Sequence, residues 1–235
     1  MKGFTFVNRQ EQNRQWSPMP RRASRNFATV NLVSRKTLPN SAQTLRTSVQ
    51  RKVKQGDYNG ALGLLTQLIR YHPTHAVDYN NRGFIYFQMG MPEKAIADYN
   101  RALQLNPELD SAYNNRANYY ATTGQLGEAL ADYEKALDLN PANVRTWINQ
   151  AITFRELGLY ELALENLDLA LMLGCLEENI YAERGRTYHL RGDWNCAIAD
   201  YQRALRQLSL SRTSSRLRRK VEKWMSQLLN PLTAC

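Results

Sequence analysis

The sequence predicts an all-α fold, a solenoid of about five stacked helix pairs, and two recurring residues indicate it. A glycine recurs every 34 residues, and an alanine follows five residues after each glycine. The glycines are Gly56, Gly90, Gly124, Gly158 and Gly192, and the alanines are Ala61, Ala95, Ala129, Ala163 and Ala197. Self-similarity at this period is typical of stacked helix pairs rather than of one compact core.

The two residue types predict where helices turn and where they cross. Glycine adopts the left-handed backbone that ends a helix at no steric cost, so each glycine is expected between the two helices of a pair. An alanine one turn into the next helix indicates a neighbouring helix too close for a larger side chain. We therefore expect tight helix crossings at the alanines.

With Ala42 as position 1, the chain divides into five repeats, which we number 1 to 5. They cover residues 42–75, 76–109, 110–143, 144–177 and 178–211. Helices are expected at about positions 2–14 and 18–30 of each repeat. Repeat 1 departs most from the pattern, and repeats 4 and 5 lack the proline that closes the others at Pro73, Pro107 and Pro141.

The repeats resemble those of the tetratricopeptide repeat (TPR) family, most closely the bacterial and plastid-type repeat proteins. In repeat 2 the family's pattern reads Tyr79, Gly83, Tyr86, Gly90, Ala95, Ala102 and Pro107. The resemblance implies a right-handed α-α superhelix without catalytic activity or cofactor. It also implies a protein–protein interaction scaffold that holds a peptide or client segment in its concave groove, including a role as an assembly factor for a larger complex.

The two ends of the chain differ from the repeats in charge. The whole chain has a net charge of +10, yet residues 76–211 hold 12 basic and 18 acidic side chains. Residues 1–41, with eight basic side chains and one acid, are predicted to form a disordered basic arm. An arm for an anionic partner and a cleaved transit segment stay open as alternatives.

Residues 212–235 are predicted to form a capping helix with a short tail. Leu217, Val221, Trp224 and Leu228 recur at helical spacing, and basic residues lie off that stripe. A solenoid needs such a helix to cover the apolar face of its last repeat. The basic termini support an alternative function, an adaptor that binds nucleic acid or an anionic membrane surface.

Composition and motifs exclude several functional classes of protein. Three cysteines and three histidines show no metal-ligand spacing, which predicts no metal site and a reducing compartment. No apolar run is long enough to cross a bilayer. We expect a cytoplasmic protein, or one of an organelle stroma or matrix if residues 1–41 include a transit segment. No phosphate loop or nucleophile motif indicates an enzyme or a small-molecule substrate.

Positions 7 and 23 of the repeats predict structural ion pairs. Three repeats have arginine at position 7 and aspartate at position 23: Arg82 with Asp98, Arg116 with Asp132, and Arg184 with Asp200. Repeat 4 changes both together, to Gln150 and Asn166. Because an arginine left near a helix interface without its carboxylate bears a desolvation cost, this joint change indicates contact between the two helices of a pair.

The resemblance also places a set of residues on the concave groove. Asn81, Asn115 and Asn149 stand one period apart, and an amide column can hydrogen-bond the backbone of an extended peptide. The full candidate set is Asn80, Asn81, Asn114, Asn115, Asn118, Asn149, Arg145, Arg155 and Arg186. The arginines favour an acidic peptide. Alternatively, the asparagines solvate the inner helices, which are the first helix of each repeat, or they pair with neighbouring helices.

Two further points concern partners. Some family members clamp the terminal carboxylates of chaperones with two cations in one repeat, but Asn179 and Glu183 stand at the corresponding positions here. The sequence therefore disfavours that clamp. Self-association through the divergent repeat 1 stays open, and the oligomeric state is not predicted.

Overall fold

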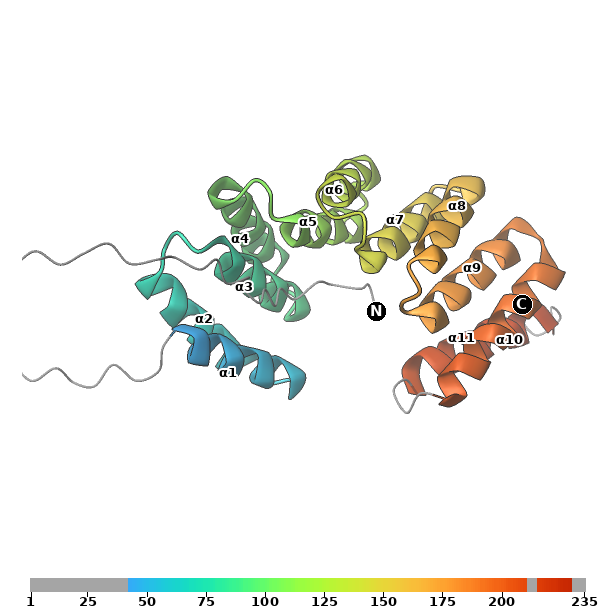
Figure 1. Ribbon diagram of the computed structural model, residues 1–235, viewed down its shortest axis with the longest axis horizontal. Helices are drawn as coiled ribbons and strands as arrows, with labels where there is room; N and C mark the ends of the chain where they lie inside the picture. The colour runs from blue at the N-terminus through green and yellow to red at the C-terminus, as the bar shows by residue number, and fades with distance from the viewer. Residues whose placement is uncertain (1–41, 211–214, 230–235) are drawn as a thin grey trace, which may run out of the picture. The chain divides into compact units, whose positions relative to one another are not determined.

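The computed structural model describes residues 42–210 and 215–229, and every regular element within them is an α-helix (Figure 1). These residues belong to two compact units that divide after Pro73. The first holds α1 and α2, and the second holds α3 to α11. The predicted basic arm, residues 1–41, lies outside the described residues.

The helices form consecutive antiparallel pairs, one for each predicted repeat, followed by one further helix. Their bounds are α1 Ala42–Lys54, α2 Tyr58–Tyr71, α3 Ala76–Gln88, α4 Pro92–Leu105, α5 Asp110–Thr122, α6 Leu126–Leu139, α7 Val144–Glu156, α8 Tyr160–Met172, α9 Glu177–Arg191, α10 Trp194–Leu210 and α11 Ser215–Leu229. The all-α superhelical repeat fold predicted from the sequence is confirmed.

The five periodic glycines lie where the sequence predicted them, in the turns between paired helices. Their φ angles are +76°, +71°, +81°, +76° and +100° for Gly56, Gly90, Gly124, Gly158 and Gly192. All five are in the left-handed region, where a side chain is disfavoured. The prediction of turn glycines is confirmed at every position.

Small residues also mark the helix crossings, as expected. Ala95, Ala129, Ala163 and Ala197 are fully buried. On the facing helix, a methyl group added at Gly83 would lie 2.8 Å from the ring of Tyr99. Such a contact is too short for carbon atoms, so the two helices of the pair approach closely because one of them has no side chain there.

Buried clusters lie both within single pairs and between neighbouring repeats. Ala117 of α5 packs with Ala129 and Tyr133 of the same pair. Ala102 and Leu103 of α4 pack with Ala112 of α5. Ile148 and Leu167 of repeat 4 pack with Ile180 of α9. Within the second compact unit, neighbouring pairs therefore cover apolar faces of one another, which is how a solenoid builds a continuous core from units that cannot bury their own.

The connection from α8 to α9 is irregular. It lacks the closing proline, and its backbone is left-handed at Gly174 and again at Leu176, with φ values of +65° and +57°. Leu176 is the one residue other than glycine with a positive φ in the described part of the chain. This strained leucine still packs against the cluster around Ile148 and Ile180.

Helix α11 covers the last pair as a cap. Val221 is fully buried against Ala197, Tyr201 and Ala204, and the other residues of its predicted stripe pack around it. The helix ends at Leu229, before Asn230 and Pro231. Across residues 42–210 and 215–229, no helix has both the length and the apolar character that crossing a bilayer requires.

Candidate functional site

The asparagines of the predicted groove form a hydrogen-bonded ladder between consecutive repeats. The side-chain amide of Asn115 donates to Oδ1 of Asn80 at 3.0 Å, and that of Asn149 donates to Oδ1 of Asn114 at 3.2 Å. Both bonds join the first helix of one repeat to the first helix of the next. Neighbouring inner helices are therefore close enough for position 6 of one repeat to contact position 5 of the repeat before.

Burial changes the expectation for these residues. Asn81, Asn115 and Asn149 have exposed fractions of 5%, 0% and 3%, and Asn80, Asn114 and Asn118 are fully buried. Asn118 donates to the carbonyl of Asn114 and accepts from the Tyr133 hydroxyl at 2.9 Å. The alternative that the sequence left open, pairing between neighbouring helices, describes these contacts better than presentation of the amides to a peptide.

The three predicted ion pairs are bidentate in the structure. In Arg82–Asp98, Arg116–Asp132 and Arg184–Asp200 the Nε–carboxylate distances are 2.7, 2.7 and 2.6 Å. In repeat 4 the Asn166 amide donates to Gln150 Oε1 at 2.7 Å. Hydrogen bonds to these carboxylates raise the pKa of Arg82 and of Arg116. In repeats 2 to 5 these pairs join the two helices of the repeat to one another.

Two of these arginines also reach the preceding repeat, which the sequence did not predict. Arg116 donates to Asn100 at 2.8 Å, and Arg184 donates to Asp168 at 2.5 Å. Both acceptors occupy position 25 of the repeat before. The guanidinium has donors for both partners, so one side chain holds its own pair together and joins it to the neighbouring pair.

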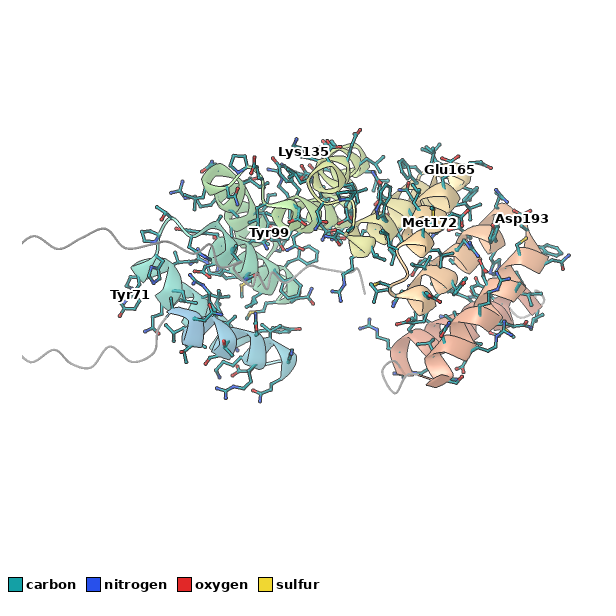
Figure 2. All side chains as sticks on the ribbon, viewed as in Figure 1. Tyr71, Tyr99, Lys135, Glu165, Met172 and Asp193 are labelled. Atoms are coloured by element: carbon teal, nitrogen blue, oxygen red, sulfur yellow. The ribbon has the colours of Figure 1, made fainter. Side chains whose placement is uncertain are left out.

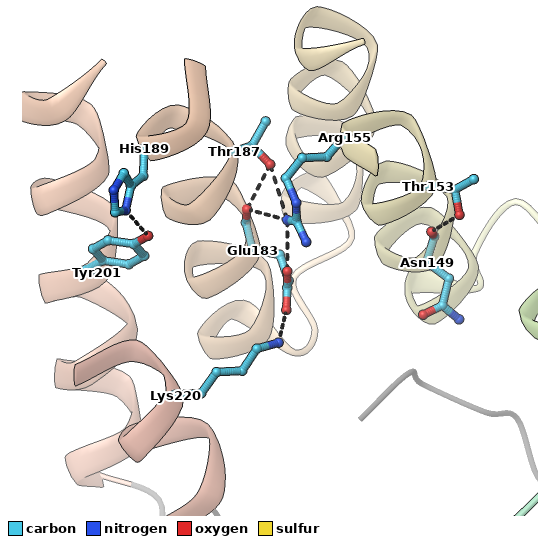
Figure 3. Close-up of polar contacts among 8 residues, drawn as sticks. All are labelled: Asn149, Thr153, Arg155, Glu183, Thr187, His189, Tyr201 and Lys220. Carbon is cyan, nitrogen blue, oxygen red and sulfur yellow. Dashed lines mark hydrogen bonds and ion pairs between the residues drawn. The ribbon is translucent and has the colours of Figure 1, made fainter. Parts of the chain in front are cut away.

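Arg155 is engaged inside the protein, contrary to its predicted place among the peptide contacts. Its Nη1 lies 2.9 Å from Glu183 of α9, and Glu183 also accepts from Lys220 of α11 at 2.8 Å (Figure 3). The carboxylate of Glu183 and the guanidinium of Arg155 are 8% and 11% exposed. Burial opposes ionisation of Glu183, but Arg155 and Lys220 outweigh it and hold the pKa of Glu183 below its ordinary value.

Arg186 is likewise held by neighbours. Its guanidinium carbon lies 5.4 Å from the ring centroid of Trp224, and its Nη1 lies 3.3 Å from Nδ1 of His189. Burial and the charge of Arg186 lower the pKa of His189. Of the three predicted groove arginines, Arg145 is the exposed one. The arginines therefore do not form the shared cationic surface that an acidic peptide would favour.

A small cavity of about 130 Å³ opens between α7 and α9. Ile148, Ile152 and Leu176 give it apolar walls. Its polar lining comes from Arg145, Asn149, Asn179 and Glu183. Arg145 and Asn149 belong to the predicted groove residues, and Asn179 and Glu183 occupy the same two positions in repeat 5. Because sites for drug-sized ligands measure roughly 300–1,000 Å³, this cavity has room for one side chain rather than for a cofactor.

Sequence models of the tetratricopeptide repeat match residues 76–109 and 111–143, and a second model of the repeat matches residues 132–165. These ranges cover repeats 2 and 3, α7 and the first part of α8, and they include two of the three ion pairs and the asparagine ladder. The chain is a tetratricopeptide repeat protein. Proteins of this family generally mediate protein–protein interactions and assembly, and they are generally non-catalytic scaffolds.

Solved structures of TPR proteins share this fold. A thermophilic TPR protein of Thermus thermophilus is 19% identical with a TM-score of 0.69, over 79% of this chain and 99% of that one. PilW, a type IV pilus biogenesis factor, is 19% identical with a TM-score of 0.69, over 81% and 89%. MamA of Desulfovibrio magneticus RS-1 is 20% identical with a TM-score of 0.60, over 74% and 97%.

The sequence of this TPR protein could predict some of these polar contacts and not others. The asparagines at positions 5 and 6 recur one period apart, but recurrence alone does not tell an inward-facing amide from an exposed one. The Arg155–Glu183–Lys220 network breaks the repeat period, so no internal comparison could have found it. Among the described residues, no three His, Cys, Asp or Glu side chains converge to hold a metal ion.

The basic face of the cap is also partly engaged. Lys220 contacts Glu183, and its ammonium lies 4.3 Å from the Trp224 ring centroid. Arg218 lies 3.7 Å from Glu222 one turn away. These contacts reduce the charge that the helix presents to an anionic surface. Within residues 42–210 and 215–229, no contact of the basic residues favours the adaptor alternative over a protein partner.

Proposed function

We propose that this TPR protein holds an extended segment of a partner protein along its inner helices, with one apolar side chain in the cavity between α7 and α9. The single observation that carries the proposal is the cavity itself, in which apolar walls meet amide side chains. An extended peptide needs both features, because its side chains require pockets and its backbone requires hydrogen-bond partners.

The cavity indicates how recognition would divide between side chain and backbone. Ile148 and Ile152 present an apolar wall from α7, and Leu176 faces them from the link to α9. Asn179 is only half-buried, so its amide can serve a peptide backbone beside the cavity. Recognition here depends on shape and amide contacts, and an acidic partner is not required.

A scaffold role in assembling a larger complex is a further part of this proposal. It is supported by the general role of the family in protein–protein interaction and assembly. The likeness to PilW adds the fold alone, because the two chains are only 19% identical. Binding of a segment in the groove is the part of the proposal that can be tested directly. The bound segment would then identify the complex.

Ile152→Asn tests the proposal, because repeat 3 has asparagine at the same position, Asn118. Peptides selected from a displayed random library on the full chain would be measured by fluorescence anisotropy. We expect a shared apolar residue among them and at least about tenfold weaker binding to Ile152→Asn, since one buried aliphatic contact contributes about 1.5–3 kcal/mol. Lys135→Asn, at an exposed position of α6 outside the proposed site, is the control. Equal affinity for wild type and Ile152→Asn would refute the cavity as the site.

A further inference from the structure

Helix α8 exposes an apolar stripe on the surface that faces away from the inner helices. Leu162, Leu169, Met172 and Leu173 are 41%, 45%, 83% and 39% exposed. They are spaced at i, i+7, i+10 and i+11, so they lie along one side of the helix. Single exposed apolar residues are ordinary, but four on one side of a helix form a patch of the kind that interaction surfaces use.

The other repeats show that this stripe is specific to repeat 4. Positions 19, 26 and 29 are exposed in each of repeats 2, 3 and 5 as well. They are polar or charged at nearly every one: Lys94, Arg101 and Gln104 in α4, Glu128, Lys135 and Asp138 in α6, and Cys196, Arg203 and Arg206 in α10. The fold therefore does not require leucine or methionine there, and solubility disfavours them.

Negative charge accompanies the stripe. Residues 156–183 contain seven acidic side chains and no lysine or arginine. Helical spacing places Glu165 on the same face, between Leu162 and Leu169. Glu165 is exposed on α8 (Figure 2), and it has no ion pair or hydrogen bond with the other described residues. The carboxylate of Glu161 lies 3.6 Å from the guanidinium of Arg191. Asp168, at the edge of the stripe, contacts Arg184. The surface is thus apolar with an acidic border.

We propose that this outer face of α8 docks an amphipathic helix of a partner protein, with a leucine-rich face and flanking lysine or arginine residues. The apolar row buries the leucines, and the cations pair with Glu165 and Glu161. A second copy of this chain fits less well, because a twofold crossing centred on the stripe places the two Glu165 side chains together. The docking surface is separate from the proposed groove, so the two can be tested independently.

A designed helical peptide with leucine at core positions and lysine at flanking positions is the probe. Two companion peptides replace either the lysines with glutamate or the leucines with serine. Each labelled peptide would be titrated with the full chain by fluorescence anisotropy at low and high salt. We expect the Leu/Lys peptide to bind, both companions to bind at least about tenfold more weakly, and added salt to weaken the Leu/Lys complex.

The chain itself supplies the matched variant. Leu162→Glu/Leu169→Lys/Met172→Asp gives α8 the residues that α6 has at the same positions, all of them exposed, so the fold is expected to persist and is checked by circular dichroism. We expect this triple variant to lose at least about tenfold in affinity for the Leu/Lys peptide, and Glu165→Lys to lose severalfold. Ile152→Asn, in the groove, is expected to bind the peptide as wild type does.

Three outcomes would overturn the proposal. The first is equal affinity of wild type and the triple variant for the Leu/Lys peptide. The second is loss of that peptide's binding in Ile152→Asn alone, which would place the site in the groove. The third is a wild-type dimer in sedimentation that the triple variant abolishes while no peptide binds, which would make the stripe a contact between copies of this chain.

Discussion

Buried tyrosines at position 24 show how one side chain is accommodated differently in each repeat. Tyr133 donates its hydroxyl hydrogen to Asn118 at 2.9 Å, and the Tyr201 hydroxyl lies 3.2 Å from Nδ1 of His189. The hydroxyl of Tyr99 is buried and has no hydrogen-bond partner among the described residues. Burial raises the pKa of all three tyrosines, and that of Tyr201 to about 12. All three hydroxyls therefore remain neutral at physiological pH.

The pair Tyr99→Phe and Tyr133→Phe tests this difference. Tyr133→Phe leaves the buried side-chain oxygen of Asn118 without its donor and is expected to cost about 1–2 kcal/mol. Tyr99→Phe removes a hydroxyl that has no partner and is expected to change the free energy of unfolding by less than about 0.5 kcal/mol, or to raise it. Urea denaturation of the two variants gives the comparison. A larger loss for Tyr99→Phe than for Tyr133→Phe would contradict it.

At the scale of elements, one carboxylate joins three helices. Glu183 of α9 contacts Arg155 of α7 and Lys220 of α11, so the cap is connected to repeat 4 through repeat 5. Arg155 is 11% exposed and Lys220 is 40% exposed. The contact to Arg155 therefore lies in a lower dielectric and matters more, because an exposed pair contributes little.

Glu183→Gln is expected to lower the free energy of unfolding by about 3 kcal/mol, because it leaves the buried Arg155 without a counter-charge. Lys220→Met, the matched control, is expected to cost under about 1 kcal/mol. The folded pKa of Glu183 lies below its ordinary value of 4.5, so its contribution is full above pH 4.5 and is lost as pH falls through the folded pKa. Urea midpoints of wild type and Glu183→Gln should therefore converge in acid. A constant difference down to pH 2 would contradict the role of the carboxylate.

The periodic part of the structure could be predicted from the sequence, and the aperiodic part could not. Turn glycines, crossing alanines and the arginine–aspartate pairs recur, so each repeat served as a comparison for the next. The direction in which an amide such as Asn115 points depends on the distance between inner helices, which the pattern does not specify. Arg155 has no counterpart at the same position of the other repeats, and neither does the left-handed backbone of Leu176. The contacts of both residues depend on the irregular link between α8 and α9.

At the scale of the whole chain, each described pair of the second compact unit contacts only its neighbours along the chain. Stability in such an array is close to a sum of local terms and neighbour interfaces. Opening of one end is therefore expected to spread inward with decreasing probability instead of unfolding every helix together. This separates a solenoid from a compact domain, where a buried charge anywhere destabilises every element alike.

Val221→Asp tests this property, because Val221 is fully buried between α11 and the last pair. An unpaired carboxylate there is expected to detach the cap. Hydrogen exchange followed by mass spectrometry should show the largest loss of protection in α11, a smaller loss in α9 and α10, and almost none in α3 and α4. Gln227→Asp, on the exposed side of α11, is the control and should leave the pattern unchanged. An equal loss of protection from α3 to α10 would mean that this unit unfolds as one cooperative block, and stability would then have to be assigned to the whole array instead of to neighbouring repeats.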